Sequence, residues 1–174
     1  HLPYKAAYGG TVTTNKGMVC IGGNNNETSY TKTTLINWSE TNGVQINILP
    51  ELPCTMDNLA ATGCGNTVFV AGGNENGKPS TSLFSLNLDN PVQGWVKMPS
   101  FPGSPRVQPV LIIQNGKIGY ELYLAGGFYA AEGETPVIPT EVLSFSLNKN
   151  TWTVETNLPH LTDSPRTLTG GCGI

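Results

Sequence analysis

Short runs of apolar residues that end in a pair of glycines recur three times along the chain. They read GMVCIGG at 17–23, NTVFVAGG at 66–73 and ELYLAGG at 121–127, and the glycine pairs are 50 and 54 residues apart. A period near fifty is much longer than the repeat of any helix or strand, so it indicates one supersecondary unit copied in tandem. The chain therefore consists of repeated units.

Each unit contains four strand-like segments. Apolar and polar residues alternate in SLFSLNL at 82–88 and EVLSFSL at 141–147, a pattern typical of strands with two different faces. The predicted innermost strands are 6–13, 59–64 and 107–113, and the second strands are 17–22, 67–72 and 120–126. The third strands are 33–38, 82–88 and 141–147, and the outer strands are 44–49, 94–98 and 151–155. Four strands in about fifty residues predict a blade of an all-β, kelch-type β-propeller.

Two further landmarks mark the end of each unit. An apolar residue followed by Pro ends the outer strand, because Pro lacks the N–H that a strand ladder needs. Trp95 and Trp152 each stand seven residues before such a Pro and offer a large packing surface between neighbouring blades. Asn115-Gly116 predicts a tight turn between the first two strands of the third unit.

These landmarks predict three four-stranded blades and the start of a fourth. The predicted limits are about 4–53, 54–102 and 103–159, with the inner strand of the next blade at 167–174. Three blades would form an open arc whose end blades expose apolar faces. We expect part of a six-bladed ring that the rest of a longer chain completes, with a second copy as the alternative.

The composition favours strands and excludes several functions. Gly (21) and Pro (13) are abundant among 174 residues and only 12% are charged, which favours short strands joined by turns. A net charge of −3 without a basic cluster argues against a nucleic-acid partner. No apolar run approaches the roughly eighteen residues that span a bilayer. The four cysteines lack metal-ligand spacing, so we expect no metal. We interpret Cys20, Cys64 and Cys172 as small buried thiols, with disulfides as the alternative.

The glycine pairs, the tryptophans and the Pro-Arg turns resemble the kelch family over the whole chain. LPYKAAYGGTVTTNKGMVCIGG at 2–23 and LAATGCGNTVFVAGGNENGKPSTSLFSLNL at 59–88 resemble the bacterial sialic acid mutarotase/epimerase family, and most closely its cyclically permuted branch. The resemblance implies a six-bladed kelch propeller that acts on N-acetylneuraminate without a cofactor. It also implies a periplasmic location.

Arg106 and Arg166 stand in the same Ser-Pro-Arg context and are the only arginines of the chain. In kelch propellers this turn opens on the mouth of the central channel, so we expect the two guanidinium groups to converge there. A guanidinium pairs with a carboxylate through two hydrogen bonds, which suits an acidic sugar. The corresponding position of the preceding unit is interpreted as Asp57. The alternative is a structural turn whose arginine forms a salt bridge with an adjacent loop.

The loops after the glycine pairs carry groups that a sugar needs. Asn24, Asn25 and Asn74 offer donors and acceptors to hydroxyl groups, and Phe128 or Tyr129 could stack on the apolar face of a sugar ring. Each of these residues alone has a simpler interpretation as an ordinary turn residue.

Mutarotation opens a hemiketal ring and requires a base and an acid. GETPVIPTEV at 133–142 resembles the Gly-Glu segment of the family, which makes Glu134 the leading candidate for a catalytic carboxylate, although Pro139 stands where the family has an Arg. Glu75 is the second candidate. The hypotheses are a sugar mutarotase or epimerase and a kelch module that binds an acidic glycan or a protein without turnover. A copper oxidase of the galactose oxidase type is disfavoured because His160 is the single interior histidine.

Overall fold

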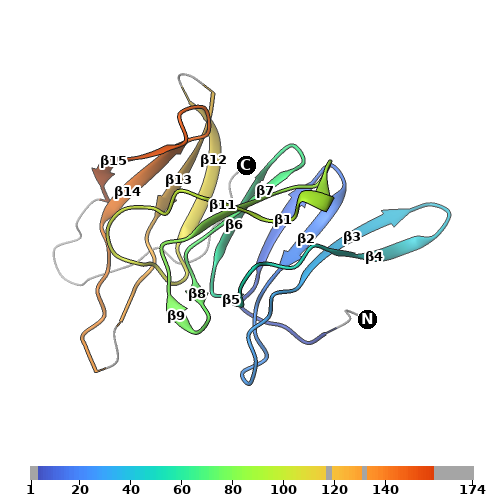
Figure 1. Ribbon diagram of the computed structural model, residues 1–174, viewed down its shortest axis with the longest axis horizontal. Coiled ribbons are helices and arrows are strands. Elements are labelled where there is room, and N and C mark those ends of the chain that lie inside the picture. Colours follow the sequence, from blue (N-terminus) through green and yellow to red (C-terminus); the bar gives the residue numbers. More distant parts are fainter. Residues whose placement is uncertain (1–3, 117–118, 131–132, 159–174) are drawn as a thin grey trace.

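Three four-stranded antiparallel sheets make up most of the described part of the chain (Figure 1). The computed structural model describes residues 4–116, 119–130 and 133–158. The innermost strands of neighbouring sheets lie side by side, β1 (Gly10–Thr14) next to β6 (Ala60–Cys64) and β6 next to β12 (Val110–Gly116). The sheets therefore share an inner edge, as the blades of a propeller do.

In every large sheet the strands follow one another in chain order from the inside outward. The first sheet contains β1, β2 (Gly17–Ile21), β3 (Thr33–Ser39) and β4 (Gly43–Leu49). The second contains β6, β7 (Thr67–Ala71), β10 (Leu83–Asn87) and β11 (Val96–Met98). The third contains β12, β13 (Gly119–Ala125), β14 (Glu141–Ser146) and β15 (Thr151–Asn157). A small sheet contains β5 (Met56–Asp57), β8 (Asn74–Glu75) and β9 (Lys78–Pro79), and η1 (Pro91–Gln93) is one turn of 3-10 helix.

The prediction of four strands per unit is confirmed by the strands that the structure describes, but the innermost strands begin later than predicted. They start at Gly10, Ala60 and Val110. The residues two positions earlier have left-handed backbone conformations that interrupt the strand, with φ of 57°, 51° and 54° at Tyr8, Asn58 and Gln108. The same interruption therefore recurs in all three sheets.

The tight turn predicted at Asn115-Gly116 is wrong, because both residues pair with β13 inside the ladder. The predicted inner strand at 167–174 lies outside the described residues. The blade limits and the six-bladed ring stay predictions. In the described part of the chain no helix is long and apolar enough to cross a membrane.

Two apolar layers join the three sheets, and β7 contributes to both. Successive side chains of a strand point to opposite faces. Val68 and Val70 belong to the buried cluster shared with the first sheet, and Phe69 and Ala71 to the one shared with the third. Because each fully buried aliphatic or aromatic side chain contributes about 1.5–3 kcal/mol, these layers are the main attraction between the sheets.

The glycine pairs bring the backbone of one sheet against the next. The N–H of Gly73 donates to the carbonyl oxygen of Arg106 at 2.7 Å, and a Cβ on Gly72 would lie 2.6 Å from that same oxygen. The N–H of Gly23 donates to the carbonyl oxygen of Met56 in the same way, at 2.8 Å. All six glycines of the three pairs have positive φ. Glycine is required here because the backbone turns to the left and approaches its neighbour too closely for a side chain.

Trp95 and Trp152 connect their own sheets to the preceding ones. Trp95 Nε1 donates to the carbonyl oxygen of Pro50 at 3.0 Å, and Trp152 Nε1 donates to that of Pro99 at 2.8 Å. Both rings pack against the apolar layers. The predicted packing of these tryptophans between neighbouring sheets is confirmed, and the indole N–H adds a polar contact to it.

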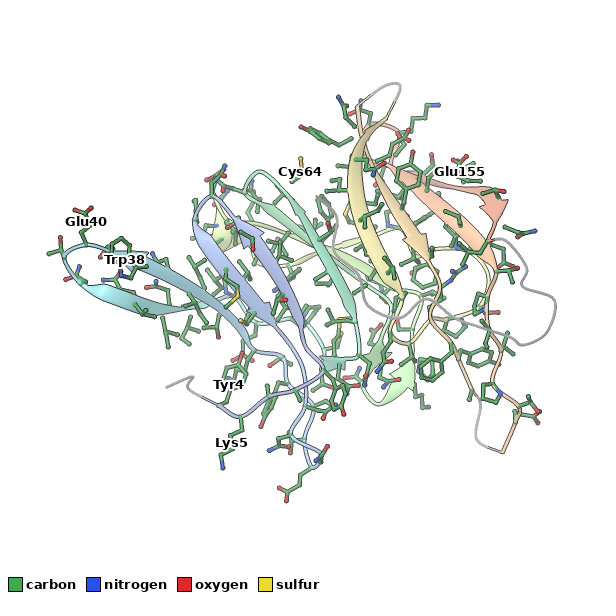
Figure 2. The ribbon with its side chains drawn as sticks, turned by 180° about the vertical axis from the view of Figure 1, so that it is seen from behind. Tyr4, Lys5, Trp38, Glu40, Cys64 and Glu155 are labelled. Carbon is green, nitrogen blue, oxygen red and sulfur yellow. The ribbon has the colours of Figure 1, made fainter. Side chains whose placement is uncertain are left out.

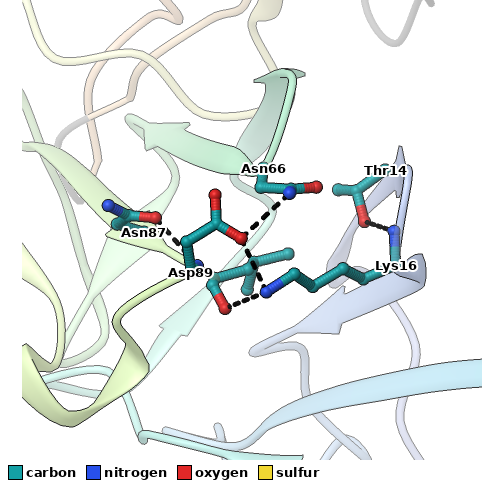
Figure 3. Close-up of polar contacts among 6 residues, drawn as sticks. Thr14, Lys16, Asn66, Asn87 and Asp89 are labelled. Carbon is teal, nitrogen blue, oxygen red and sulfur yellow. Dashed lines mark hydrogen bonds and ion pairs between the residues drawn. The ribbon is translucent and has the colours of Figure 1, made fainter.

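A polar cluster connects the first two sheets at the hairpin end of β1 and β2 (Figure 3). Lys16 Nζ donates to the carbonyl oxygen of Leu88 and forms an ion pair with Asp89, both at 2.7 Å. Asn66 Nδ2 also donates to Asp89, at 3.0 Å. Because the carboxylate is exposed to water, this ion pair aligns the sheets more than it stabilises them.

The first sheet leaves an apolar face uncovered. Residues paired across strands point to the same side of a sheet. The register aligns Met18, Ile36 and Ile46 in one row and pairs Trp38 with Val44. Trp38 is 67% exposed and lies near the free end of the β3–β4 hairpin, away from the other two sheets (Figure 2). This face agrees with the apolar surface expected at the end of an open arc.

We expect Gly73→Ala to destabilise the protein strongly. Gly73 has φ of 79°, and an added Cβ would lie 2.4 Å from the carbonyl oxygen of Asp57. Left-handed strain costs about 1–2 kcal/mol, and overpacking adds about 1–3 kcal/mol. Gly77→Ala is the matched control, because Gly77 has the same φ of 79° but nothing within 4 Å of the added Cβ. In urea unfolding, Gly73→Ala should lose at least about 1 kcal/mol more than Gly77→Ala; equal losses would contradict the close approach.

Candidate functional site

The loops that follow the three glycine pairs leave the same end of the sheets (Figure 1). A hollow of about 490 Å³ lies there. It is lined by Tyr8, Asn24, Asn26, Glu27, Thr28, Ser29, Asn58 and Gln108. Amide, hydroxyl and carboxylate groups dominate this lining, so the hollow suits a ligand rich in hydroxyl groups.

The loop after the first glycine pair is shaped by its own asparagines. Asn24 Oδ1 accepts a hydrogen bond from the N–H of Asn26 at 3.2 Å, and Asn25 Oδ1 accepts one from the N–H of Thr28 at 2.8 Å. Such turns hold a loop in shape without help from its neighbours. Asn24 lines the hollow, and both Asn24 and Asn25 line a second one of about 800 Å³ that also contains Lys5. Both predicted residues therefore border a hollow, with their side-chain oxygens engaged in the turn.

Asp57 is a buried anion beside this loop, only 5% exposed. Its Oδ1 accepts hydrogen bonds from Asn58 Nδ2 at 2.6 Å and Asn74 Nδ2 at 2.8 Å, and its Oδ2 accepts one from Ser29 Oγ at 2.5 Å. Burial raises the pKa of Asp57, but these bonds and one from Asn24 outweigh it, so the pKa lies below its ordinary value. Asp57 is therefore ionised at neutral pH and orients the amides around it.

Tyr8, Asn58 and Gln108 form a row along the inner edge of the three sheets, here called the inner row. The N–H of Asn58 donates to the carbonyl oxygen of Tyr8 at 2.7 Å, and the N–H of Gln108 donates to that of Asn58 at 2.8 Å. Gln108 Nε2 also donates to Asn58 Oδ1 at 2.8 Å. A chain of side-chain hydrogen bonds thus runs from Gln108 through Asn58 to the Asp57 carboxylate.

Glu75 belongs to a separate network. Its Oε2 accepts hydrogen bonds from Ser80 Oγ at 2.7 Å and Ser82 Oγ at 2.6 Å. Burial raises the pKa of Glu75, but hydrogen bonds from Ser82, Ser80 and Cys54 outweigh it and the pKa lies below its ordinary value. A general base works best with a pKa near the working pH, so this geometry disfavours Glu75 as the base. Its catalytic role stays a prediction.

The described cysteines, Cys20, Cys54 and Cys64, are free thiols. Burial and the nearby Glu75 raise the pKa of Cys54 to about 11, so this thiol is inert near neutral pH. Within residues 4–116, 119–130 and 133–158, no three His, Cys, Asp or Glu side chains form a group that could hold a metal ion.

Arg106 is buried between the second and third sheets, where it is 2% exposed. Its Nη1 donates to the carbonyl oxygens of Glu141 at 3.0 Å and Gly126 at 3.3 Å, and its Nη2 lies 3.4 Å from the Glu141 carboxylate. The open guanidinium expected at the channel mouth is not observed. This is the structural alternative considered for the Pro-Arg turn, and a ligand role for Arg106 stays a prediction.

The residue that corresponds to Arg106 in the preceding unit is Met56, so the predicted match with Asp57 is wrong by one position. The carbonyl oxygen of Met56 accepts from Gly23 as that of Arg106 does from Gly73. Met56 is fully buried, like Arg106. This position therefore directs its side chain into the interior in both units.

Phe128 takes the place of Asn24 and Asn74 in the third unit. Its backbone exchanges two hydrogen bonds with Val107, at 2.7 and 3.0 Å, as the backbone of Asn24 does with Ala7. The third loop thus offers an aromatic ring where the other two offer amides.

Tyr129 pairs with Val137 through two backbone hydrogen bonds of 3.0 and 2.7 Å. Glu134 lies in the loop between them and is exposed. Arg166 lies outside the described residues, so its convergence with Arg106 stays a prediction.

Comparison with known proteins adds the family. A family model described as N-acetylneuraminate epimerase matches residues 49–174, well over half of the chain. The chain belongs to the N-acetylneuraminate epimerase family. The family members from Pasteurella multocida (strain Pm70) and Haemophilus influenzae (strain PittEE) are 34% identical over 125 residues and 32% identical over 124 residues. These matches cover 72% and 71% of this chain but only 30% of each relative, so the chain spans about a third of their length.

Among solved structures, that of YjhT matches with a TM-score of 0.70. The match covers 90% of this chain and 53% of that protein, at 16% identity. This likeness concerns the fold, which is the all-β, kelch-type β-propeller that the repeat predicted.

The sequence predicted Asn24, Asp57 and Asn74 as residues of one site, and the structure of this epimerase-family chain places them together. The prediction missed Ser29 and the inner row. The row could have been found from its spacing, because residues 8, 58 and 108 are separated by 50 and 50 positions, close to the period of the glycine pairs. Ser29 had no such signal, since its role depends on how its loop folds over the next sheet.

We expect Asp57→Asn to destabilise this protein in a pH-dependent way. Folding lowers the pKa of this carboxyl group, so its charge stabilises the fold at pH values above the unfolded-state pKa of about 3.9. The stabilisation is lost as the pH falls through the pKa of the folded state. Urea unfolding at pH 7 should show a loss of about 1–3 kcal/mol, because buried donors lose their acceptor. The difference from wild type should shrink below about pH 4. Asp89→Asn, on the exposed ion pair, should lose less, and a loss independent of pH would contradict the role of the Asp57 charge.

Arg106→Met tests the buried arginine. The variant places methionine where Met56 stands in the preceding unit, and it leaves the carbonyl oxygens of Gly126 and Glu141 without this donor. We expect a loss of about 1–3 kcal/mol in the free energy of unfolding, because buried acceptors lose their donor. Unchanged stability in urea unfolding would contradict this structural role and favour the prediction that Arg106 is a ligand.

Proposed function

We propose that this chain is part of a sialic acid mutarotase or epimerase, an isomerase acting on N-acetylneuraminate. The observation that carries the proposal is the match of residues 49–174 to the N-acetylneuraminate epimerase family. The polar hollow at the loop end of the propeller supports it, because a sugar needs many hydrogen-bonding partners in fixed positions.

The proposed reaction opens and closes a hemiketal ring. A base removes the proton of the anomeric hydroxyl group, the bond from the anomeric carbon to the ring oxygen breaks, and its electron pair is protonated by an acid. Rotation and attack from the other face of the resulting carbonyl close the ring as the other anomer. Only protons are transferred, so the proposal includes no redox cofactor.

Glu134 is the proposed base. Its side chain is exposed in the loop between Tyr129 and Val137, which follows the third glycine pair. The loops after the glycine pairs leave the same end of the sheets (Figure 1). Asp57 is less suited to this role, since its lowered pKa makes it a weak base and its oxygens already accept several hydrogen bonds. Glu75 has the same disadvantages and remains the second candidate.

Arg166 is the proposed partner of the sugar carboxylate, because a guanidinium matches a carboxylate in a bidentate pair. Arg106 stays a second and weaker candidate, since its guanidinium already contacts Glu141. We further propose that the remaining blades come from the rest of a longer chain, with a second copy as the alternative. The exposed apolar face of the first sheet supports a further blade there. A periplasmic location is also part of the proposal.

A kelch module that binds an acidic glycan or a protein partner without turnover is the alternative function. This function needs Arg166 and the polar hollow for binding, but no catalytic base. The two functions differ in whether a carboxylate reaches the anomeric oxygen of the bound sugar.

We expect the intact protein to accelerate the equilibration of N-acetylneuraminate anomers. NMR spectra of the freshly dissolved sugar should show equilibration far above the buffer rate, and Glu134→Gln should reduce the added rate about 100-fold, as loss of a general base does. Glu40→Gln, an exposed glutamate at the far end of the β3–β4 hairpin, is the control and should leave the rate unchanged (Figure 2). Binding of the sugar without any acceleration would support the binding module instead.

A further inference from the structure

We propose that Tyr8 is the aromatic wall of a subsite for the uncharged, hydroxyl-bearing part of the sugar. The inner row places Tyr8 beside Asn58, and both residues line the hollow. The inference rests on the proposed function, which it deepens by naming the part of the substrate that this hollow takes.

The backbone of Tyr8 is the first observation. Its φ of 57° is left-handed, a conformation in which bulky side chains are rare and asparagine is common. Asn58 has nearly the same conformation, with φ of 51°, at the corresponding position of the next sheet. A tyrosine thus occupies a position whose backbone suits asparagine better. Strain of this kind concentrates at binding sites, where the side chain has a use that outweighs its conformational cost.

The exposure of the ring is the second observation. Within the described sheets, Tyr8 is 58% exposed although it borders a hollow, and it belongs to neither of their apolar layers. Tyr4 and Tyr30 differ, because their rings contact each other at 5.2 Å and the Tyr4 hydroxyl group pairs with Thr34 at 3.2 Å. An exposed ring at the edge of a polar hollow offers its face to the C–H groups of a sugar.

The charge of the hollow decides which part of the sugar it takes. Asp57 is a buried anion beneath the amide of Asn58, and Glu27 lines the same hollow. Two carboxylates repel the carboxylate of an acidic sugar. The amides of Asn58 and Gln108, held in order by their hydrogen bonds, instead match hydroxyl and acetamido groups. The carboxylate of the sugar therefore points away from this hollow.

Backbone spacing makes the subsite compact. The N–H of Asn58 donates to the carbonyl oxygen of Tyr8 at 2.7 Å, so the two backbones are in direct contact and a sugar on the Tyr8 ring lies beside Asn58. The stacking face and the polar group thus belong to adjacent members of one row.

Tyr8→Asn is the discriminating variant, because Asn58 demonstrates that asparagine adopts this backbone in the same fold. Tyr120→Asn is the matched control, since Tyr120 is 50% exposed and lies at the hairpin end of β13. Titration calorimetry on the full-length protein would use N-acetylneuraminate and, as the uncharged probe, N-acetylmannosamine. Urea unfolding of each variant monitors the fold.

We expect Tyr8→Asn to unfold at the same or a higher urea concentration than wild type and to bind both sugars about tenfold more weakly, as loss of a stacked ring implies. Tyr120→Asn should bind both sugars like wild type. If Tyr8→Asn binds both sugars with unchanged affinity, the inference is wrong. It is also wrong if N-acetylmannosamine does not compete with N-acetylneuraminate for the wild-type protein. If wild type binds both sugars without accelerating anomer exchange, the proposed enzyme fails, while the titrations of Tyr8→Asn still decide the subsite.

Discussion

The contact between each glycine pair and the backbone of the next sheet is the constraint on which the rest of the structure depends. The N–H of Gly73 donates to the carbonyl oxygen of Arg106 at 2.7 Å, and this bond holds the incoming chain against the preceding sheet. Arg106, and Met56 one unit earlier, must direct their side chains inward. The residue two positions further on then takes a left-handed conformation before the innermost strand begins. One close backbone approach, repeated, thus positions a buried residue and an inner-row residue in each unit.

The candidate site follows from this arrangement and from the cost of burying a charge. Asp57 comes directly after Met56 and lies beside the loop of the first sheet, where a carboxylate without partners would be strongly destabilising. Amides and a hydroxyl group from both sheets satisfy it. The result is a set of amides held in fixed orientations around an anion, which is the preorganisation that recognition of a polar ligand requires.

In the proposed enzyme, substrate binding and proton transfer depend on different loops. The ionised, fully bonded Asp57 orders the binding groups, whereas the exposed Glu134 keeps a carboxylate available for proton transfer. Repetition makes this division possible, because the same loop position carries Asn24, Asn74 and Phe128 in successive units. Each unit can therefore change its chemistry without changing its backbone.

The sequence by itself determined the repeat, the order of the four strands in each unit and the need for glycine and tryptophan at the contacts between units. These are local properties, because strand alternation, left-handed glycines and turn residues act within a few positions of the chain. Only the tertiary structure decided that Arg106 is buried against Glu141, that Met56 and not Asp57 is its counterpart, and that Ser29 completes the Asp57 network. Those outcomes depend on which groups of neighbouring sheets meet, and a shift of one residue reverses the side to which a strand side chain points.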